Sequence, residues 1–384
     1  MIKILVIYEQ INNTIEVNLS VLKIILHQKD IKQRYKMSKD VSEMDLNWCD
    51  ICYSMRPSSI YTLNIGKLIR DTGRIFITAF DDDLLNLPKH NSGSWCIKYT
   101  RECLSLSDLV IMCNPVLASA YQSLYPHINV AIIHALVNEQ DIIPVGDEND
   151  VVKIVYAAGA DHTAVFDSLI KPVLDKVFEK SDCKIELHLM GVCPNLSQLK
   201  YKENIKFHHP RPLEEYKKFM RNYCFDIGLA PLHDDSFSNK KYFRKYIDYA
   251  EFGIAGIYSN CAPYTFVVKD SYNGILVDNN PDSWYEAIVW AIDNLPSMKA
   301  MARNSQNHLR KDFSVSAIQS QFYSQIYPLL ERLTSRSTIY YHRKHINEVI
   351  FEVRMIYHQI KSHILSDGFI GTSKIIMYRL IKRI

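Results

Sequence analysis

Residues 225–259 decide the fold of this chain, and they read FDIGLAPLHDDSFSNKKYFRKYIDYAEFGIAGIYS. An apolar run of strand length, a polar loop, a periodic segment, a glycine turn and a second apolar run follow one another. This order predicts strand, loop, helix, turn and strand. On a helical wheel the apolar side chains share one arc and the charged side chains share the opposite arc. The charged arc comprises Lys241, Arg244, Lys245 and Asp248.

The sequence also predicts where this helix begins and ends. Ser236, Ser238 or Asn239 can cap a helix that begins near Lys240, and Gly253 suits the left-handed residue that ends one. Because the helix follows a buried-looking strand, its first turn is placed where open α/β sheets bind ligands, and its N–H groups favour a phosphate. The alternative interpretation is that the cations form a solvated helix face.

The stretch resembles the motif F-N-x-x-K-S-x-x-K-Y-x-E-Y-x-x-x-G-x-P-V of the retaining glycosyltransferases of family 4, which have the GT-B fold. The matching residues are Phe237, Lys241, Lys245, Tyr246, Asp248, Tyr249 and Gly253. Residues 261–292, CAPYTFVVKDSYNGILVDNNPDSWYEAIVWAI, resemble the family's P-Y-x-x-x-I-x-x-x-x-N-G-x-L-V-x-x-x-x-x-x-W-x-x-A-I. Upstream, IFITAFDDDLLNLP (75–88) and LSDLVIMCNPVLASAY (106–121) resemble the D-D-D-L and A-D-x-V-x-x-x-T-x-x-L segments of its first domain.

Strand-length apolar runs alternate with periodic or polar segments through most of the chain, which predicts parallel, doubly wound sheets. The alternation pauses at the polar, acidic stretch VGDENDVV, residues 145–152, and then restarts. With the resemblance, this predicts an α/β protein of the GT-B fold: two Rossmann-like doubly wound domains that face each other across a cleft, followed by a helical tail. We expect an acceptor domain over residues 1–147, a nucleotide-sugar donor domain over 148–333 and a basic amphipathic tail over 334–384.

The resemblance implies roles for side chains of the second domain. Lys241 and Lys245 would stabilise the negative charge that develops on a departing nucleotide diphosphate. Asp248 would accept hydrogen bonds from hydroxyls of a ribose or sugar; the alternative is an intrahelical ion pair with Lys241 or Arg244. We predict as catalytic residues Lys241, Lys245 and Asp248, and as donor-binding residues Gly159, His162, Arg244, Tyr246 and Tyr264.

Four residues of the first domain are predicted to lie on the acceptor side. Asp81, Asp82 and Asp83 follow one strand-like run, and Arg56 lies in the turn after the preceding run. A carboxylate triplet also suits Mg²⁺ or Mn²⁺, as in the other large glycosyltransferase fold, and a third interpretation is that it caps a helix before LLNLP. Because the GT-B fold generally works without a metal, we expect neither a metal nor a cofactor. The nucleotide-sugar is a substrate.

The chain departs from the family's pattern at several positions. Many members carry two Glu residues eight apart, and here these positions hold Lys240 and Asp248. An Arg and Lys pair for the diphosphate is not evident in YAAGADHTAVFD, residues 156–167, so diphosphate binding would rest on Lys241, Arg244 or Lys245. Asn273 and Gly274 are typical of a hairpin turn.

The composition indicates in which compartment the protein is found and which partners are disfavoured. The nine cysteines are odd in number and scattered, which disfavours a disulfide framework, and Cys49 and Cys52 are predicted to be buried structural thiols. The apolar run MIKILVIYE has strand length and lacks the parts of a signal peptide, and no run reaches the length of a membrane-spanning helix. A cytoplasmic location fits these features. The slightly acidic body and the lack of a recognisable motif argue against nucleic acid as a partner.

The end of the chain differs in charge from the rest. Residues 334–384 contain nine Lys or Arg and three Asp or Glu, a net charge of +6, whereas the remainder carries −3. Its apolar residues follow a helical period, so residues 344–384 predict a basic amphipathic segment that suits an anionic membrane surface at the inner membrane face. The alternative is a helix that packs back on the first domain.

The function that these features predict is transfer of a sugar, such as a hexose, from a nucleotide-sugar to a glycan or lipid-linked acceptor. The resemblance implies a retaining mechanism and a setting in the assembly of a surface polysaccharide. A transferase of polyol phosphate and an inverting sugar transferase are alternatives among enzymes. The alternative from another class is a catalytically silent GT-B domain that binds a glycan or a partner and scaffolds an assembly complex, which the missing first Glu, replaced by Lys240, and the absent Arg and Lys pair favour.

Overall fold

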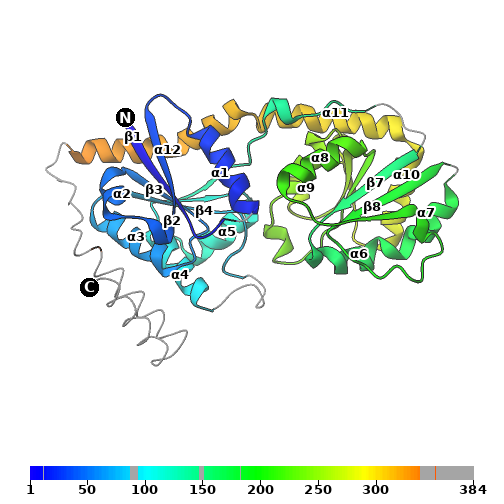
Figure 1. Ribbon diagram of the computed structural model, residues 1–384, viewed down its shortest axis with the longest axis horizontal. Coiled ribbons are helices and arrows are strands. Elements are labelled where there is room, and N and C mark those ends of the chain that lie inside the picture. The colour runs from blue at the N-terminus through cyan, green and yellow to red at the C-terminus, as the bar shows by residue number, and fades with distance from the viewer. Residues whose placement is uncertain (12, 87–93, 147–150, 182, 338–350, 352–384) are drawn as a thin grey trace, which may run out of the picture. The chain divides into compact units, whose positions relative to one another are not determined.

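The computed structural model describes residues 1–11, 13–86, 94–146, 151–181, 183–337 and 351 of the 384 residues. The chain divides into two compact units (Figure 1). Unit 1 comprises Met1–Ile133 and Gln321–Ile384, and unit 2 comprises His134–Ser320. Each unit is built on a six-stranded sheet in which every strand pair is parallel.

The sheet of unit 1 has the strand order β2-β1-β3-β4-β5-β6. Its strands are β1 (Ile2–Tyr8), β2 (Ile31–Met37), β3 (Ile51–Met55), β4 (Ile75–Phe80), β5 (Leu109–Met112) and β6 (Val130–Ile132). Its helices are α1 (Asn13–Ile25), α2 (Glu43–Trp48), α3 (Ile60–Asp71), α4 (Ser94–Leu106) and α5 (Pro115–Leu124). The order reverses between β1 and β3, and ligands of doubly wound sheets bind at the carboxyl ends of strands at such a point.

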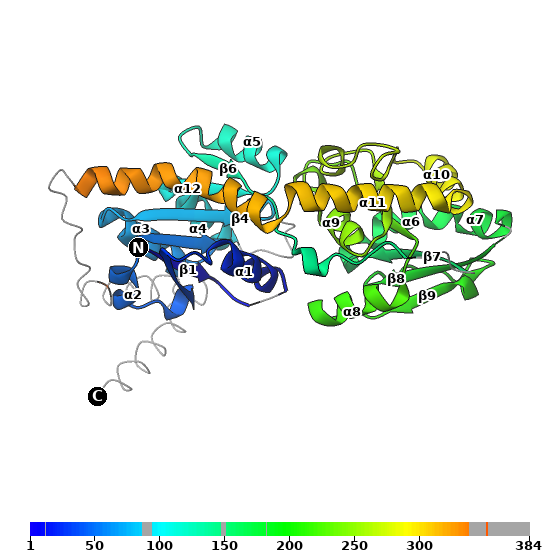
Figure 2. The ribbon, with the colours of Figure 1, turned by 90° about the horizontal axis from the view of Figure 1, so that it is seen from above.

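The sheet of unit 2 has the order β12-β11-β10-β7-β8-β9, with β9 and α8 at one edge (Figure 2). Its strands are β7 (Val151–Ala157), β8 (Lys184–Met190), β9 (Ile205–His208), β10 (Ile227–Ala230), β11 (Ala255–Ser259) and β12 (Ile275–Val277). Its helices are α6 (Thr163–Leu169), α7 (Leu174–Lys180), α8 (Leu213–Tyr223), α9 (Arg244–Glu251), α10 (Pro281–Asp293) and α11 (Leu295–Asp312). The division between the units falls within α12 (Val315–Ser337).

Central strands of both sheets are buried on both faces, which is what helices on two sides of a parallel sheet produce. All five residues of β3 and all four of β10 are buried. In unit 2 one face of the sheet packs around Trp284 and the other around Tyr249, and both side chains are at most 1% exposed. The doubly wound architecture predicted for both halves is therefore present.

The units divide earlier than the predicted boundary at residue 147. Residues 134–145 pack on unit 2, where Val137 N–H donates to the carbonyl of Phe313 and Ile143 N–H donates to that of Glu251, each at 2.8 Å. Apolar contacts made by Val137 anchor the same segment. The acidic stretch marks a loop before β7, and the separation between compact units lies at Ile133.

The helix of the opening stretch begins later than predicted. Helix α9 begins at Arg244, after a short 3-10 turn, η6 (Ser238–Lys240). The side chain of Asp235 caps that turn, because its Oδ1 accepts hydrogen bonds from the backbone N–H groups of Phe237 and Ser238 at 2.9 and 2.7 Å. The predicted C-terminal end is confirmed, since Gly253 has φ +69°.

The predicted hairpin turn at Asn273 and Gly274 is wrong. The strand that follows, β12, pairs in parallel with β11. The Asn273 side chain is buried, accepts a hydrogen bond from the Lys269 N–H and donates to the Tyr246 hydroxyl. Asn273 therefore stabilises a buried loop through its side chain.

Three further predictions concern the buried thiols, the C-terminal tail and membrane-spanning helices. Cys49 and Cys52 are fully buried free thiols, as predicted. The predicted tail helix over 344–384 lies outside the described residues except at Phe351, which is buried in the core of unit 1. Among the helices of the described residues, none combines the length and the apolar character that a membrane span requires.

Candidate functional site

Two glycine turns lie at the candidate site of unit 2, where β7 and β8 have their carboxyl ends. Ala158 N–H donates to the carbonyl of Met190 at 3.0 Å, so the loops after both strands lie against each other. Gly191 has φ +80°, and a Cβ there would lie 2.3 Å from the carbonyl oxygen of Ala158. A Cβ at Gly159 would lie 2.5 Å from Oδ1 of Asp161. The turn at Gly191 needs glycine, because a backbone oxygen lies against it at a positive φ, whereas at Gly159 the neighbouring group is the end of a side chain.

Lys241 meets the loop after β7. Its Nζ lies 3.4 Å from Oδ2 of Asp161 and 3.4 Å from Nε2 of His162. The Asp161 side chain is 65% exposed and that of Lys241 is 24% exposed. The structure therefore brings together the predicted residues Gly159, His162 and Lys241, although Lys241 comes about 80 residues later in the chain.

The basic side chains of this site lower one another's pKa. Burial, with a contribution from Lys241, lowers the pKa of Lys245 to about 8. Burial and the ammonium groups of Lys245 and Lys241 lower the pKa of His162 to about 3, so its imidazole is neutral at pH 7. An anion that bound here would relieve this repulsion, because an opposite charge favours the charged form of a base.

Asp161 is the nearby carboxylate, and the ammonium group of Lys241 stabilises its charge. Burial opposes ionisation of its carboxyl, but the neighbouring His162 and Lys241, which also donates a hydrogen bond to it, outweigh burial and lower the pKa. The sequence pattern alone predicts no role for Asp161. The sequence feature that could have indicated a role is the position of Asp161 between Gly159 and His162.

Asp248 lies one turn along α9 from Arg244, and the two form an ion pair of 2.7 Å. The intrahelical ion pair considered as the alternative for Asp248 is therefore present. An Nη of Arg244 also lies 3.9 Å from Oε2 of Glu251, whose carboxyl pKa burial raises to about 7 against the opposing effect of Arg244. Arg244 thus lies between two carboxylates of its own helix.

Two aromatic residues predicted to bind the donor belong to the core. Tyr246 is fully buried, and its hydroxyl bonds His308 at 2.7 Å and Asn273 at 2.9 Å. Tyr264 is 4% exposed, and its ring centroid lies 4.9 Å from that of Tyr258. Because both side chains are covered by protein, we assign them a structural role in the core of unit 2.

In unit 1 the predicted acceptor-side residues divide into two groups. Nε of Arg56 lies 3.4 Å from Oδ1 of Asp81, and both side chains are about one quarter exposed. Asp82 accepts the backbone N–H of Asp83, whereas the carboxylate of Asp83 is fully buried and bonds Tyr121. Burial removes Asp83 from contact with an acceptor. Residues 84–86 form a turn, so the triplet caps no helix there.

Glu9, which the sequence analysis missed, fills the N-terminus of α3 in unit 1. Its Oε1 accepts hydrogen bonds from the N–H groups of Ser58 and Ser59 at 3.1 and 3.0 Å and from the hydroxyl of Thr62 at 2.6 Å. A helix N-terminus beside a topological switch point is otherwise an anion site. A carboxylate of the chain itself already occupies it, so a phosphate is disfavoured there. The sequence signal was a Glu directly after the first strand.

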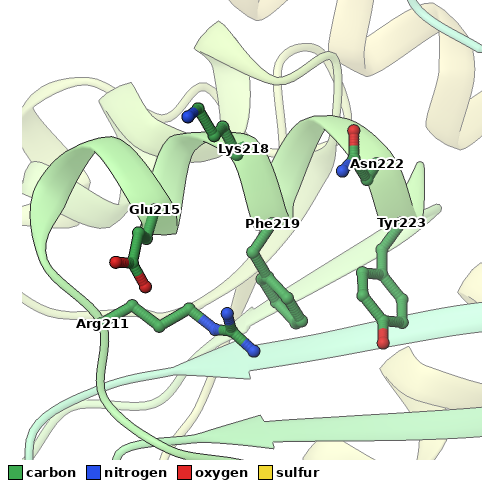
Figure 3. Close-up of a pocket in the computed structure, with 6 residues that line it drawn as sticks. All are labelled: Arg211, Glu215, Lys218, Phe219, Asn222 and Tyr223. Atoms are coloured by element: carbon green, nitrogen blue, oxygen red, sulfur yellow. The ribbon is translucent and has the colours of Figure 1, made fainter.

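Among the described residues, no group of three or more His, Cys, Asp or Glu side chains is arranged to hold a metal ion. A small, open pocket of about 210 Å³ lies on α8, where the guanidinium of Arg211 lies over the ring of Phe219 (Figure 3). It shares no lining residue with the loops after β7 and β8.

Comparison with known proteins gives structural matches only. No family model and no curated protein sequence matches the chain. A sucrose-phosphate synthase from Thermosynechococcus elongatus aligns with a TM-score of 0.64 at 13% identity over 87% of this chain and 100% of that one. HepE of Anabaena in complex with UDP and glucose aligns at 0.60, with 12% identity over 85% and 100%. A glycosyltransferase from Rickettsia africae aligns at 0.60, with 14% identity over 86% and 98%.

These alignments cover both units, and they agree with the two parallel six-stranded sheets. At such low identity the alignments establish the fold alone, so the chemistry is argued from the residues of the site. The resemblance noted in the sequence is confirmed at the level of the fold: the chain has the GT-B fold that these glycosyltransferases share.

Proposed function

We propose that this protein transfers a sugar from a nucleotide-sugar, bound by unit 2, to a glycan or lipid-linked acceptor. The observation that carries the proposal is the convergence of Lys241, Lys245 and His162 on the glycine turn after β7. This place is the carboxyl end of a central strand, where doubly wound folds bind their ligands. HepE, which shares the fold, was solved with UDP and with UDP-glucose.

The electrostatics of the site suit a diphosphate leaving group. When a nucleoside diphosphate departs from a sugar, negative charge develops on its oxygens, and ammonium groups fixed beforehand lower the barrier. Lys241 and Lys245 supply two such charges, and burial of Lys245 strengthens its attraction to an anion. Neutral His162 donates or accepts one hydrogen bond at the same place. We assign no nucleophile, since a retaining reaction can proceed by attack of the acceptor on the leaving-group face.

Unit 2 is the better candidate than unit 1 for the donor. In unit 1 the helix N-terminus at the switch point is filled by Glu9. In unit 2 the corresponding edge carries Lys241, whose Nζ lies beside His162 of the glycine turn after β7. A diphosphate is therefore stabilised in unit 2 and repelled in unit 1.

A catalytically silent glycan-binding or scaffold protein is the second candidate, and a specific observation favours it. Asp248, which stands where the family has the Glu that contacts hydroxyls, is engaged by Arg244 at 2.7 Å. Lys240 stands where many members have the other Glu. If the ion pair persists when a donor binds, Asp248 offers fewer free lone pairs to hydroxyls.

The two candidates differ in turnover. UDP-, GDP-, dTDP- and ADP-sugars would be tested for binding by calorimetry and for donor hydrolysis, with wild type, Lys241→Ala and Asp248→Asn. Lys176→Ala, which removes an exposed lysine on α7, is the matched control. The proposal predicts that one nucleotide class binds and is hydrolysed, and that Lys241→Ala loses at least about 10-fold in donor affinity. Binding of glycans with no response to any donor would favour the silent protein.

The stereochemical course and the setting are further parts of the proposal. We propose a retaining mechanism, which NMR of the product anomer tests directly: the product of a retaining enzyme keeps the anomeric configuration of the donor. An inverted product would assign the chain to an inverting sugar transferase. For the setting we propose assembly of a surface polysaccharide in the cytoplasm, with the basic tail at an anionic membrane face. Sedimentation with anionic and neutral vesicles tests that contact.

A further inference from the structure

Glu251 is a buried carboxylate of α9 that the proposed mechanism does not use. It lies about one turn beyond Asp248, and its side chain is 4% exposed. Among the described residues, its Oε1 has no hydrogen-bond partner, although this atom is shielded from solvent. A buried carboxylate oxygen without a hydrogen bond is unfavourable, because burial removes the water that would stabilise its charge. A functional role is one reason for which a folded protein keeps such a group.

Two cations lie near Glu251, each just beyond hydrogen-bond distance. Nζ of Lys217, on α8, lies 3.7 Å from its Oε1, and an Nη of Arg244 lies 3.9 Å from its Oε2. Lys217 also has a closer partner, because its Nζ lies 3.4 Å from Oδ2 of Asp141. Asp141 belongs to the segment before β7 and not to the candidate site, so a bound donor leaves this partner of Lys217 in place.

Arg244 differs from Lys217, because its closer partner is a residue that a donor would use. Its Nε lies 2.7 Å from Oδ1 of Asp248. A guanidinium presents five N–H donors in a planar fork, so it pairs with one carboxylate through Nε and with a second through Nη. When donor hydroxyls donate to Asp248, the attraction of Asp248 for Arg244 weakens. The unsatisfied carboxylate of Glu251 is then the acceptor toward which Arg244 moves.

The charges around Glu251 are balanced while Glu251 is ionised. Within the described residues, ion pairs connect three carboxylates and three cations of α8, α9 and the segment before β7: Asp141, Asp248, Glu251, Lys217, Arg221 and Arg244. Tyr216 of α8 faces the same charges, and burial raises its pKa well above the usual value, so its hydroxyl stays neutral. Without the charge of Glu251, one cation is in excess, and Asp248 holds Arg244 more strongly.

The ionisation of Glu251 takes place near neutral pH. Burial raises the pKa of its carboxyl to about 7, and Asp248 contributes in the same direction. Arg244 and Lys217 oppose this rise. The charge that attracts Arg244 is therefore gained as the pH rises through about 7.

We infer that Glu251 is a positioning residue of the donor site, which draws Arg244 away from Asp248 and so frees Asp248 to accept hydroxyl groups of the donor. The inference rests on the proposed function, in which Asp248 contacts hydroxyls of a ribose or sugar. With this second partner for Arg244, the chain keeps the ion pair of 2.7 Å when it is free and still uses Asp248 when the donor binds.

Calorimetry with two ligands and the full chain tests the inference. The first ligand is whichever of UDP-, GDP-, dTDP- and ADP-sugars binds best, and the second is inorganic pyrophosphate, which has the phosphates but no sugar hydroxyls. Glu251→Gln keeps the shape of the side chain and removes its charge. It should weaken binding of the nucleotide-sugar about 10-fold, as expected for loss of a charge-assisted hydrogen bond to Asp248. Glu214→Gln, which replaces an exposed glutamate on α8, is the matched control and should change neither affinity.

Pyrophosphate separates positioning from a general effect of charge. Removal of a carboxylate by itself strengthens binding of any anion nearby, so Glu251→Gln should leave the affinity for pyrophosphate unchanged or slightly higher. The two ligands should therefore respond differently to one substitution. The effect on the nucleotide-sugar should also vanish in an Arg244→Gln background, since Glu251 acts through Arg244. A merely structural Glu251 would instead change the Tm and affect both ligands alike.

The pH profile supplies a test that needs no variant. The affinity of wild type for the nucleotide-sugar should rise as the pH increases through about 7, because Glu251 then gains its charge. Glu251→Gln should lack this rise. A wild-type affinity that does not rise there would contradict the inference.

The remaining outcomes distinguish this inference from the proposed function. If a nucleotide-sugar binds but Glu251→Gln binds it as wild type does, or if both ligands change in parallel, the inference alone is overturned. The same holds if the effect persists without Arg244. If pyrophosphate binds wild type but no nucleotide-sugar does, the proposed function fails, and the inference fails with it.

Discussion

Nζ of Lys241 lies 3.4 Å from a carboxylate oxygen of Asp161, which belongs to the glycine turn after β7. This contact joins two loops that are far apart in the sequence, and it places a carboxylate where the proposed function requires a diphosphate. Asp161 is largely exposed, so water screens the pair and its contribution to stability is small. Its consequence is for binding: a bound diphosphate would compete with Asp161 for Lys241.

Asp161→Asn should therefore strengthen binding of a nucleoside diphosphate. The change keeps the shape of the side chain and removes the competing charge, and we expect the Kd of the preferred diphosphate to fall about 2- to 5-fold, in line with a screened surface pair. Calorimetry at low and high salt measures it. Asp167→Asn, on α6 and paired with Lys171, is the control and should leave the Kd unchanged. Weaker binding by Asp161→Asn would show that the carboxylate itself contacts the donor.

The affinity for a diphosphate should fall at alkaline pH, because Lys245 then loses its proton. Burial lowers its pKa to about 8 in the free protein, and a bound anion favours the charged form and raises that pKa. Binding near pH 9 should then be accompanied by proton uptake, and affinity should fall as the pH rises through 8. Calorimetry in two buffers of different ionisation enthalpy measures the uptake.

The same pKa shift affects stability with a defined sign. An unfolded lysine holds its proton up to about 10.5, so between pH 8 and 10.5 the unfolded chain binds more protons at this position and folding stability rises with pH. Lys245→Met removes this contribution. If wild type and Lys245→Met show the same pH dependence of unfolding in this range, Lys245 is not buried as described.

Gly191→Ala should destabilise unit 2 more than a left-handed glycine normally would. The new Cβ would lie 2.3 Å from the carbonyl oxygen of Ala158, and the residue has φ +80°. Gly73 provides a matched control, because its φ is +72° and its Cβ would meet nothing within 4 Å. We expect Gly73→Ala to cost about 1–2 kcal/mol and Gly191→Ala to cost more, on the order of 3 kcal/mol or above. Equal losses in denaturant unfolding would refute the close approach of the two loops.

Tyr246→Phe separates a structural from a donor-binding role. The hydroxyl bonds Asn273 and His308 in a fully buried setting, so its loss should cost about 1–3 kcal/mol of stability. The Kd of the nucleoside diphosphate should not change, because protein covers the side chain. Urea unfolding and calorimetry on the same variant measure both quantities. A weaker Kd at unchanged stability would return Tyr246 to the donor site.

Local patterns predicted the elements of this fold better than their contacts. The strands and helices around α9, and its glycine end at Gly253, follow from period and composition because neighbours along the chain decide them. The start of α9 was missed because Asp235 caps a separate turn and Phe243 is buried before the helix begins. The Asn273–Gly274 dipeptide was misread because the bond that decides its structure reaches Tyr246, 27 residues away.

Part of the site was also predictable, because some of its residues belong to local sequence patterns. The motif positions of Lys241 and Lys245 and the turn at Gly159 are visible in the sequence, and the fold brings Lys241 to that turn. Asp161 and Glu9 were missed because their roles depend on partners about 50 to 80 residues distant. The engagement of Asp248 by Arg244 was foreseen as an alternative, since residues four apart on a helix are neighbours.

Hydrogen exchange with and without a nucleoside diphosphate tests the central claim most directly, because it reports where the anion binds. The full chain would be compared with UDP, GDP, dTDP and ADP, each at saturating concentration. The account predicts protection of the loop around residues 158–163 and of residues 238–245 by one of these ligands, with no change at residues 56–62. Protection at 56–62, or no protection of either unit 2 segment by any of the four ligands, would contradict it.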